Sequence, residues 1–264
     1  MTVQTRASQF GDGFFESILV IEGKIPLLAG HWTRALRTAS FLHMDLSETF
    51  DTKENLADFI LEGLSSTSCL RCRLDIWRAG GGRYLPEHNH TLQEVVIIPY
   101  DNPFNREFII KDRLEVAEGI QMYSKGMNRY KTVSKIEQVL LSIEAQEKCC
   151  QDLVVLNELG QICEAISSNI FFIDKKGDLW TPGLSSGCLP GVMREYIIQV
   201  FGSGMTIHES VIISSDLPRF VSCFVCNAIQ GIVPVNNIMG YQFNVELAKN
   251  IHKILIDKLL GKSN

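Results

Sequence analysis

The sequence predicts a mixed α+β protein with two domains. Its 264 residues suffice for one large domain or two small ones with a sizeable core. The predicted strands gather in groups with helices around them, instead of alternating strictly with helices. We therefore expect an N-terminal α/β domain over residues 1–117. The larger C-terminal domain, over residues 118–264, is expected to be rich in short strands.

The composition excludes several classes of function. Hydrophobic residues make up 45% and charged residues 21%, as in ordinary soluble globular proteins. The net charge of −5 and the absence of a Lys/Arg block argue against nucleic-acid and anionic-membrane partners. The first residues form no signal peptide, and no apolar run approaches the roughly 18–20 residues that span a bilayer. We expect a cytoplasmic protein that acts on a small molecule.

Eight cysteines raise the question of disulfides or metal. Two Cys-x-x-Cys pairs occur, at residues 69/72 and 223/226, and each lies in a strand pattern. Residues three apart in a strand point to opposite faces, which does not suit a shared metal ion. We expect reduced, buried cysteines that act as small hydrophobic residues, and no metal site.

In the first domain, one strand is predicted by strict alternation. Over residues 69–77, the side chains of Leu70, Cys72, Leu74 and Ile76 are apolar and those between them are mostly charged, which indicates a half-buried strand. The other predicted elements are strands over 14–21 and 92–99, helices over about 31–43 and 52–64, and a flexible loop over 78–83.

The second domain is predicted to open with a helix after residue 134. Residues 134–137 read as a capping box, and an apolar stripe of Ile136, Val139, Leu140 and Ile143 is expected to be buried. The remaining elements are predicted as strands over 153–157, 162–166, 170–174, 179–181, 205–213, 220–228 and 232–236, a helical turn at 214–217, and helices over about 191–201 and 245–260.

Lys131 is the first residue that suggests chemistry. It lies just before the predicted helix, between Tyr130 and Thr132, a poor position for a merely solvated charge. Burial would disfavour the ammonium form, and a neutral amine can attack an aldehyde. A surface lysine is the ordinary alternative, and Lys125 and Lys135 are rival candidates.

Glu164 and Gly191 suggest what such an aldehyde would be. Glu164 interrupts an apolar strand, where a carboxylate needs a partner unless it faces outward. A protonated pyridine nitrogen would be such a partner, and its protonation makes the ring an electron sink. Gly191 opens a predicted helix, where backbone N–H groups and the helix dipole favour a phosphate. Glycine at a helix start is common, so the combination carries the argument: it indicates pyridoxal phosphate.

A resemblance to a known family joins these features. Residues 164–171 (Glu-x-Ile-x-x-Asn-Ile-Phe), 179–181 (Leu-x-Thr) and 189–194 (Leu-x-Gly-Val-x-Arg) resemble the signature of the class IV aminotransferases, the fold-type IV pyridoxal-phosphate enzymes. Residues 10–17 and 31–34 are similar to two further family motifs. The resemblance implies a small α/β domain, a larger domain with a strand-rich pseudo-barrel, and a homodimer.

The resemblance also implies roles for individual residues. Lys131 matches the lysine that forms the Schiff base with pyridoxal 5'-phosphate and moves the substrate proton. Glu164 matches the acid on the pyridine nitrogen, and Arg34 the arginine on the phosphate. The cofactor site is completed, on the same resemblance, by Asn169, Gly191, Val192, Met193, Asn227, Ala228 and Ile229.

Several positions narrow the choice within the family. Ile136 stands where the aminotransferases usually have a tyrosine, and Met193 and Ala228 stand where they often have threonines. Residues 131–140 and 226–229 look like those of 4-amino-4-deoxychorismate lyase, which releases pyruvate and p-aminobenzoate. This resemblance leads us to expect a lyase.

Two alternatives and one open site remain. A branched-chain or D-amino-acid aminotransferase would use the same lysine and acid. A degenerate, non-catalytic cofactor-binding protein is a third hypothesis, against which the intact Lys131, Glu164 and Arg34 argue. Arg78 and Arg83, in a glycine-rich loop like that of the lyase, are candidates for binding a substrate carboxylate; the alternative is a solvated hairpin.

Overall fold

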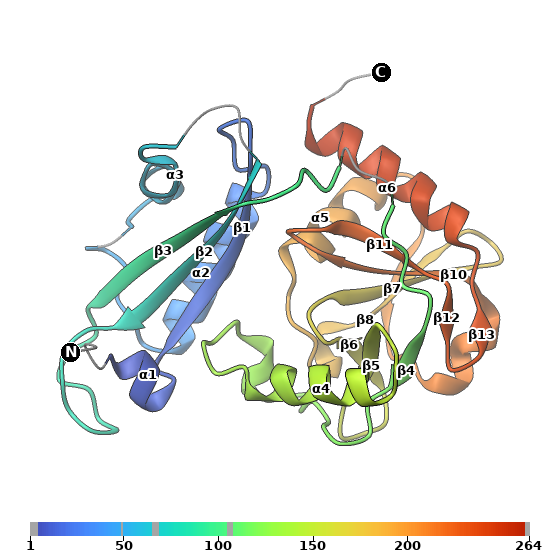
Figure 1. Ribbon diagram of the computed structural model, residues 1–264, viewed down its shortest axis with the longest axis horizontal. Coiled ribbons are helices and arrows are strands. Elements are labelled where there is room, and N and C mark those ends of the chain that lie inside the picture. The colour runs from blue at the N-terminus through green and yellow to red at the C-terminus, as the bar shows by residue number, and fades with distance from the viewer. Residues whose placement is uncertain (1–4, 49, 65–68, 105–107, 262–264) are drawn as a thin grey trace. The chain divides into compact units, whose positions relative to one another are not determined.

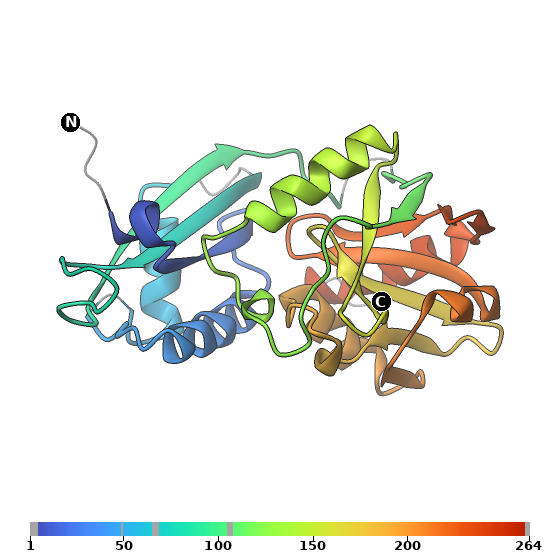
Figure 2. The ribbon, with the colours of Figure 1, turned by 90° about the horizontal axis from the view of Figure 1, so that it is seen from below.

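The computed structural model describes residues 5–48, 50–64, 69–104 and 108–261, which form two compact units (Figures 1 and 2). Unit 1 comprises Met1–Asn102 and Tyr130–Ser134, and unit 2 comprises Pro103–Arg129 and Lys135–Asn264. The predicted boundary at residue 117 is therefore wrong. Strand β4 (Leu114–Val116) pairs with β5 (Asp152–Leu156) and so belongs to unit 2.

Unit 1 is a three-stranded antiparallel sheet with helices packed against it. The sheet order is β1 (Gly13–Ile21), β2 (Cys69–Arg78) and β3 (Thr91–Pro99). The buried alternation predicted for β2 is confirmed at Leu70, Cys72, Leu74 and Ile76. Residues of α2 (Leu28–Phe41) and α3 (Lys53–Leu61) join these side chains in one core. A short helix that the sequence pattern did not predict, α1 (Arg6–Phe10), precedes β1.

The segment with Lys131 lies along β1 of unit 1. The Phe15 N–H donates to the Lys131 carbonyl at 3.0 Å, and the Val133 N–H donates to the Gly13 carbonyl at 3.0 Å. The ring of Tyr130 stacks on Phe41 with 3.8 Å between centroids. These contacts give Lys131 a fixed backbone in unit 1, although its neighbours on both sides in the chain belong to unit 2.

Unit 2 consists of two five-stranded sheets around a shared core, as the predicted strand-rich fold requires. One sheet has the order β11-β10-β7-β8-β9 and the other β13-β12-β4-β5-β6. Ile170, Phe172 and Val225 of the first sheet pack in one cluster with Leu114 and Val154 of the second. The further strands are β6 (Ile162–Ala165), β7 (Asn169–Asp174), β8 (Leu179–Pro182), β9 (Ile207–Ser210), β10 (Phe220–Asn227), β11 (Gly231–Val235), β12 (Asn237–Ile238) and β13 (Tyr241–Gln242).

Three α-helices and three 3₁₀ turns complete unit 2 among the described residues. The α-helices are α4 (Ile136–Glu147), α5 (Val192–Phe201) and α6 (Val245–Leu259), and the 3₁₀ turns are η1 (Met127–Arg129), η2 (Leu184–Ser186) and η3 (Ser214–Arg219). No helix in the described part of the chain is long and apolar enough to cross a membrane.

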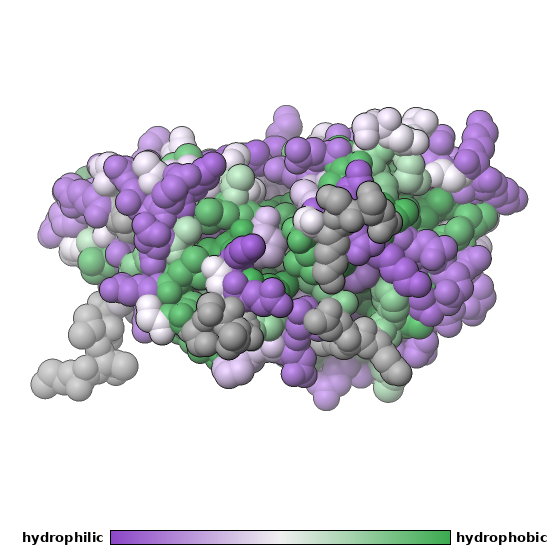
Figure 3. Space-filling model, turned by 90° about the horizontal axis from the view of Figure 1, so that it is seen from above, coloured by the Kyte–Doolittle hydropathy of each residue, from purple (hydrophilic) through white to green (hydrophobic). Residues whose placement is uncertain are grey.

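The prediction for α4 was wrong in two respects. Lys135 is the N-cap and makes no side-chain capping bond, so the capping box does not form. Leu141 and Ala145 are buried, whereas the expected stripe is exposed, from 46% at Ile143 to 61% at Ile136. Apolar residues occur on several sides of this helix, so their periodicity alone could not select the buried side. Figure 3 shows that apolar residues also interrupt the polar surface elsewhere, on the face it draws.

The cysteines are free thiols, most of them buried. Burial raises the pKa of Cys72 and, with the nearby charge of Glu164, that of Cys188 to about 11. Such thiols stay protonated at neutral pH and pack as small apolar groups. Within the described residues, no three His, Cys, Asp or Glu side chains are grouped so that they could hold a metal ion.

Candidate functional site

Lys131 lies beside an aromatic ring and a second cation. Its Nζ is 4.4 Å from the centroid of Phe15, and the guanidinium carbon of Arg73 is 3.8 Å from the same centroid. The amine and the guanidinium are therefore at most about 8 Å apart. Asp75 orients Arg73 by accepting from its Nε and its Nη2, both at 2.8 Å. The sequence interpretation did not single out Arg73, which looked like one more outward residue of an alternating strand.

A buried polar cluster connects β1 to α2. Glu16 of β1 accepts from the Arg34 Nε at 2.8 Å and also from Nη2, and the His31 Nδ1 is 2.7 Å from its carboxylate. Glu16 is fully buried, and burial raises its pKa. The charge of Arg34 and the hydrogen bonds from Arg34 and His31 outweigh burial and lower the pKa to about 2.

The same burial keeps His31 neutral. Burial lowers the pKa of His31, and the bond to Glu16 offsets this only in part. His31 therefore donates its Nδ1–H to Glu16 as a neutral imidazole. Glu16 was missed as a site residue, although an acid within an apolar strand is the same signal that selected Glu164.

Arg34 is buried and committed to Glu16, which bears on its predicted role. The ion pair uses Nε and one hydrogen of Nη2. A phosphate would have to be bound by Nη1 and the other Nη2 hydrogen, out of the five donors of a guanidinium. Its contact with the phosphate stays a prediction; what the structure provides is a guanidinium with a fixed orientation.

In unit 2, Glu164 and Asn169 hold the chain just before α5. Glu164, at 7% exposure, accepts from the Leu189 N–H at 2.9 Å, and the Asn169 Nδ2 donates to the Leu189 carbonyl at 2.8 Å. Glu164 is thus a buried residue, so the outward-facing alternative does not apply. Because both backbone groups of Leu189 are held by side chains from β6 and β7, the approach to α5 has a defined position.

Gly191 is required by a close approach and not by its backbone angles. Its φ of −74° suits any residue, but a Cβ there would lie 1.9 Å from the Asn169 Oδ1. Gly191 is the N-cap of α5, so the amides of Val192 and Met193 lie in the first turn and have no intrahelical acceptor. Two such amides at the positive end of a helix fit a phosphate group.

Gly191→Ala is expected to weaken cofactor binding by about 10-fold or more. The added methyl group displaces Asn169 and so moves the Val192 and Met193 amides, and a hydrogen bond to a charged group is worth about 1.5–3 kcal/mol. Titration of apoprotein with pyridoxal phosphate, followed by visible absorbance, measures the effect. Gly204→Ala is the matched control, since a Cβ at Gly204 meets nothing within 4 Å. Equal affinities in the two variants would contradict this account of Gly191.

Asn227 shapes the second predicted phosphate turn from within. Its Oδ1 accepts from the N–H groups of Ile229 at 3.0 Å and Gln230 at 2.8 Å, and its Nδ2 donates to the Ser168 Oγ at 3.1 Å. The Ile229 amide would have to share its hydrogen to bind a phosphate. The hydrogen bonds of the Asn227 side chain account for the conformation of the turn. Contact with the phosphate stays a prediction for Asn227, Ala228 and Ile229.

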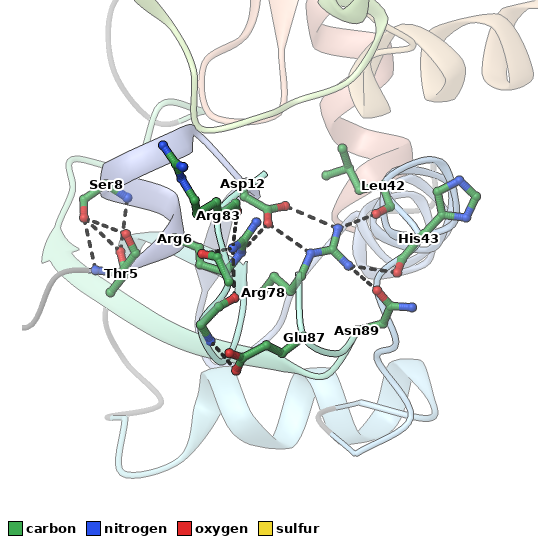
Figure 4. A network of polar contacts seen from close by, with 12 residues as sticks. Thr5, Arg6, Ser8, Asp12, Leu42, His43, Arg78, Arg83, Glu87 and Asn89 are labelled. Atoms are coloured by element: carbon green, nitrogen blue, oxygen red, sulfur yellow. Dashed lines mark hydrogen bonds and ion pairs between the residues drawn. The ribbon is translucent and has the colours of Figure 1, made fainter. Parts of the chain in front are cut away.

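Arg78 is fixed in a network that Figure 4 shows, and the structure favours a structural role for it. Its guanidinium donates to Asp12 at 3.0 Å, to the carbonyls of Leu42 and His43 at 2.6 and 3.0 Å, and to the Asn89 Oδ1 at 2.6 Å. It is 6% exposed, so it is not part of a solvated hairpin. A substrate carboxylate would have to displace these acceptors.

Arg6 holds the glycine-rich loop, and Arg83 projects from it. The Arg6 Nη1 donates to the carbonyls of Gly81, Gly82 and Arg83 at 2.8–3.2 Å, and its Nε donates to Asp12 at 2.8 Å (Figure 4). The Arg83 side chain is exposed. Of the two predicted carboxylate-binding arginines, only Arg83 therefore has a side chain accessible to solvent. Its role stays a prediction.

Comparison with known proteins identifies the family. The family model for amino-transferase class IV matches residues 13–238, and the chain belongs to this family. An aminodeoxychorismate lyase of Vibrio harveyi is 25% identical over 91% of this chain and 88% of its own length. A putative branched-chain-amino-acid aminotransferase of Methanocaldococcus jannaschii is 26% identical over 94% of this chain and 86% of its own.

Solved structures confirm the fold. A branched-chain aminotransferase of Thermoproteus uzoniensis is 22% identical and superposes with a TM-score of 0.86, covering 100% of this chain and 91% of that one. A 4-amino-4-deoxychorismate lyase of Pseudomonas aeruginosa is 24% identical, with a TM-score of 0.81 over 98% of this chain and 95% of that one. The predicted two-part α+β fold of the fold-type IV enzymes is therefore confirmed.

Pyridoxal phosphate is the cofactor of this family, and the residues present fit it. The start of α5 suits the phosphate because Gly191 leaves no Cβ beside Asn169. Within unit 2, Glu164 is a buried carboxylate of the kind that a protonated pyridine nitrogen needs, and within unit 1, Lys131 is an amine held beside an apolar ring; the contacts of both residues with the cofactor stay predictions. When bound, the cofactor supplies an electron-withdrawing ring that stabilises negative charge on the substrate carbon. The chain is thus a pyridoxal-phosphate-dependent enzyme.

Proposed function

We propose that this enzyme is a 4-amino-4-deoxychorismate lyase. The observation that carries the proposal is the position of Arg73, partly exposed at 41% of its side chain and beside Lys131. The proposed substrate carries two carboxylates, so its binding needs cationic groups close to the amine that reacts. Asp75 takes up Nε and one Nη2 hydrogen of Arg73, so a carboxylate would be bound by Nη1 and the other Nη2 hydrogen, a pair of planar donors that matches two carboxylate oxygens. The Vibrio harveyi relative supports the same activity.

Lys131 carries the proton in this proposal. It removes the proton from the ring carbon that bears the substrate amine. The carbon–oxygen bond to the enolpyruvyl group then breaks, and the departing group takes up a proton to become pyruvate. The remaining ring is aromatic p-aminobenzoate. The atoms balance without water or an oxidant, so the chain needs only one acid–base group at the reacting carbon.

One assay tests the proposal directly. The enzyme loaded with pyridoxal phosphate is given 4-amino-4-deoxychorismate with no keto acid present. The lyase proposal predicts equal amounts of p-aminobenzoate and pyruvate over many turnovers. Failure to release p-aminobenzoate, together with turnover of an amino acid and 2-oxoglutarate, would refute it.

A transaminase for branched-chain or D-amino acids is the second candidate. The Methanocaldococcus jannaschii relative supports it, since it matches this chain as completely as the Vibrio harveyi lyase does. The two candidates share Lys131 and Glu164 and differ in whether a keto-acid acceptor is required. For either reaction we propose a homodimer, which the exposed apolar residues of α4 support.

Arg73→Gln is expected to raise the KM for 4-amino-4-deoxychorismate by about 10- to 100-fold with a smaller effect on kcat, because one charge-assisted contact of about 1.5–3 kcal/mol is lost. Steady-state kinetics with p-aminobenzoate detection measures the two parameters. Arg71→Gln is the matched control, since Arg71 is exposed on the same strand and the same face. Equal KM values in the two variants would remove Arg73 from the substrate site.

A further inference from the structure

The chain segment that leads to Lys131, residues 122–129, is docked on the loop between β5 and β6. The Met122 N–H donates to the Leu156 carbonyl at 2.9 Å. Ser124 donates through its N–H and its Oγ to Glu158, at 2.9 and 2.6 Å. The segment then turns through η1, and Lys131 follows two residues after η1 ends. We call residues 122–129 the lysine approach.

Residues 183–191, between β8 and α5, end at the first turn proposed to bind the phosphate, and we call them the phosphate loop. Side chains accept or donate to its backbone at several places. The Ser186 carbonyl accepts from the Asn157 Nδ2 at 3.0 Å, and the Leu189 carbonyl accepts from Asn169 at 2.8 Å. These side-chain bonds, together with the 3₁₀ turn η2, fix the conformation of the loop.

Asn128 joins the lysine approach to the phosphate loop. Its Nδ2 donates to the carbonyl of Gly187, four residues before Gly191. Gly187 has a φ of +97°, and a Cβ there would lie 2.6 Å from the Tyr123 carbonyl oxygen. Only glycine allows the two segments to approach this closely.

A second glycine makes room for the Asn128 amide itself. A Cβ at Gly126 would lie 2.3 Å from the Asn128 Oδ1 and 2.9 Å from the Tyr123 Cβ. The close packing at Gly126 and Gly187 is a separate observation from the hydrogen bond, and both point to the same contact. The contact is made by backbone and side-chain groups of unit 2 alone.

We propose that Asn128 is a positioning residue that couples the phosphate loop to the lysine approach, so that a phosphate bound at α5 and the placement of Lys131 assist one another. Asn128 acts through the Gly187 carbonyl and not on the reacting atoms. The proposal rests on the cofactor-binding part of the site and is independent of the choice between lyase and transaminase.

The test separates the phosphate from the rest of the cofactor. Apoprotein is titrated with pyridoxal phosphate and with pyridoxal, and visible absorbance gives a Kd for each. The Kd for pyridoxal divided by the Kd for pyridoxal phosphate measures what the phosphate contributes to binding. In Asn128→Ala this ratio is expected to fall by about fivefold or more, the range of a typical coupling between two sites. A purely structural loss would weaken both ligands equally and leave the ratio unchanged.

Gly126→Ala supplies an independent variant, because its added methyl group displaces the Asn128 amide. It should lower the ratio as Asn128→Ala does, and the double variant should be no worse than either. Asn237→Ala and Gly204→Ala are matched controls, since Asn237 caps an exposed turn and Gly204 faces open space. If one variant fails to fold, as judged by its Tm, the other still gives the comparison.

A second arm uses inorganic phosphate as the probe. In the wild-type apoprotein, phosphate is expected to tighten pyridoxal binding, and in Asn128→Ala this effect should be lost. Kd ratios within twofold of wild type in both Asn128→Ala and Gly126→Ala would overturn the proposal. A wild-type protein whose affinity for pyridoxal is unchanged by phosphate would also overturn it. Neither outcome depends on which substrate the enzyme turns over.

Discussion

Lys131→Ala is expected to lower kcat by at least about 1000-fold, for the lyase and the transaminase reaction alike. In the proposed mechanism this lysine holds the cofactor aldehyde and moves the substrate proton, and a positioned acid–base group alone contributes about 100- to 10,000-fold. Its carbonyl accepts from the Phe15 N–H, and the nearby Val133 N–H donates to the Gly13 carbonyl, so we expect alanine to leave the segment folded. Steady-state turnover and the visible spectrum of the purified variant measure the effect.

Two other lysines serve as matched controls for this prediction. Lys125 and Lys135 lie within six residues of Lys131 in the sequence and were its rivals. Lys125→Ala and Lys135→Ala should retain turnover within a few-fold of wild type. Turnover by Lys131→Ala close to that of wild type, or its loss in one of the other two variants alone, would assign the chemistry to a different lysine.

Glu16→Ala is expected to destabilise the fold by about 3–5 kcal/mol, because it leaves Arg34 buried without its counter-charge. Arg34 and His31 both bond to this carboxylate, and all three side chains are buried. Urea unfolding at pH 7 measures the change. Glu54→Ala is the control, since the Glu54 side chain is 68% exposed in an ion pair with Lys53. A loss no larger than that of the control would contradict the assigned role of Glu16.

The same residue should make stability depend on pH in the acid range. The pKa of Glu16 is lowered from 4.5 to about 2 in the folded protein, a shift worth about 3 kcal/mol. Its contribution is therefore fully present above the unfolded pKa and is lost as the pH falls towards 2. Glu16→Gln should flatten this part of the stability profile, and an unchanged profile would show that another group is responsible.

Local sequence patterns predicted most strands because each pattern states how the strand is buried. The alternation in β2 marks one buried face, and the apolar runs of β7 and β10 mark strands that are buried on both faces. The pattern failed for α4, where apolar side chains lie on more than one side and the neighbouring sheet decides which are buried. It also missed α1, which is only five residues long and is held by its cap at Thr5.

The sequence could predict residues whose burial costs free energy unless they have a polar partner. Glu164 is an example, and the structure shows that it is buried. The partners themselves were harder to predict, since they come from distant parts of the chain. Arg78 looked available to a substrate because nothing in its neighbourhood reveals Asp12 and Asn89 as acceptors. The same applies to Lys131, which was assigned to the second domain but lies on β1.

Borohydride reduction of the protein loaded with pyridoxal phosphate, followed by peptide mass spectrometry, tests the central claim most directly. The account predicts that the cofactor becomes covalently fixed to the peptide that contains Lys131, and that fragmentation places its mass on that lysine. Glu164→Gln should still be labelled at Lys131, with an altered visible spectrum. Labelling at Lys125 or Lys135, or no labelling of a protein saturated with the cofactor, would contradict the account.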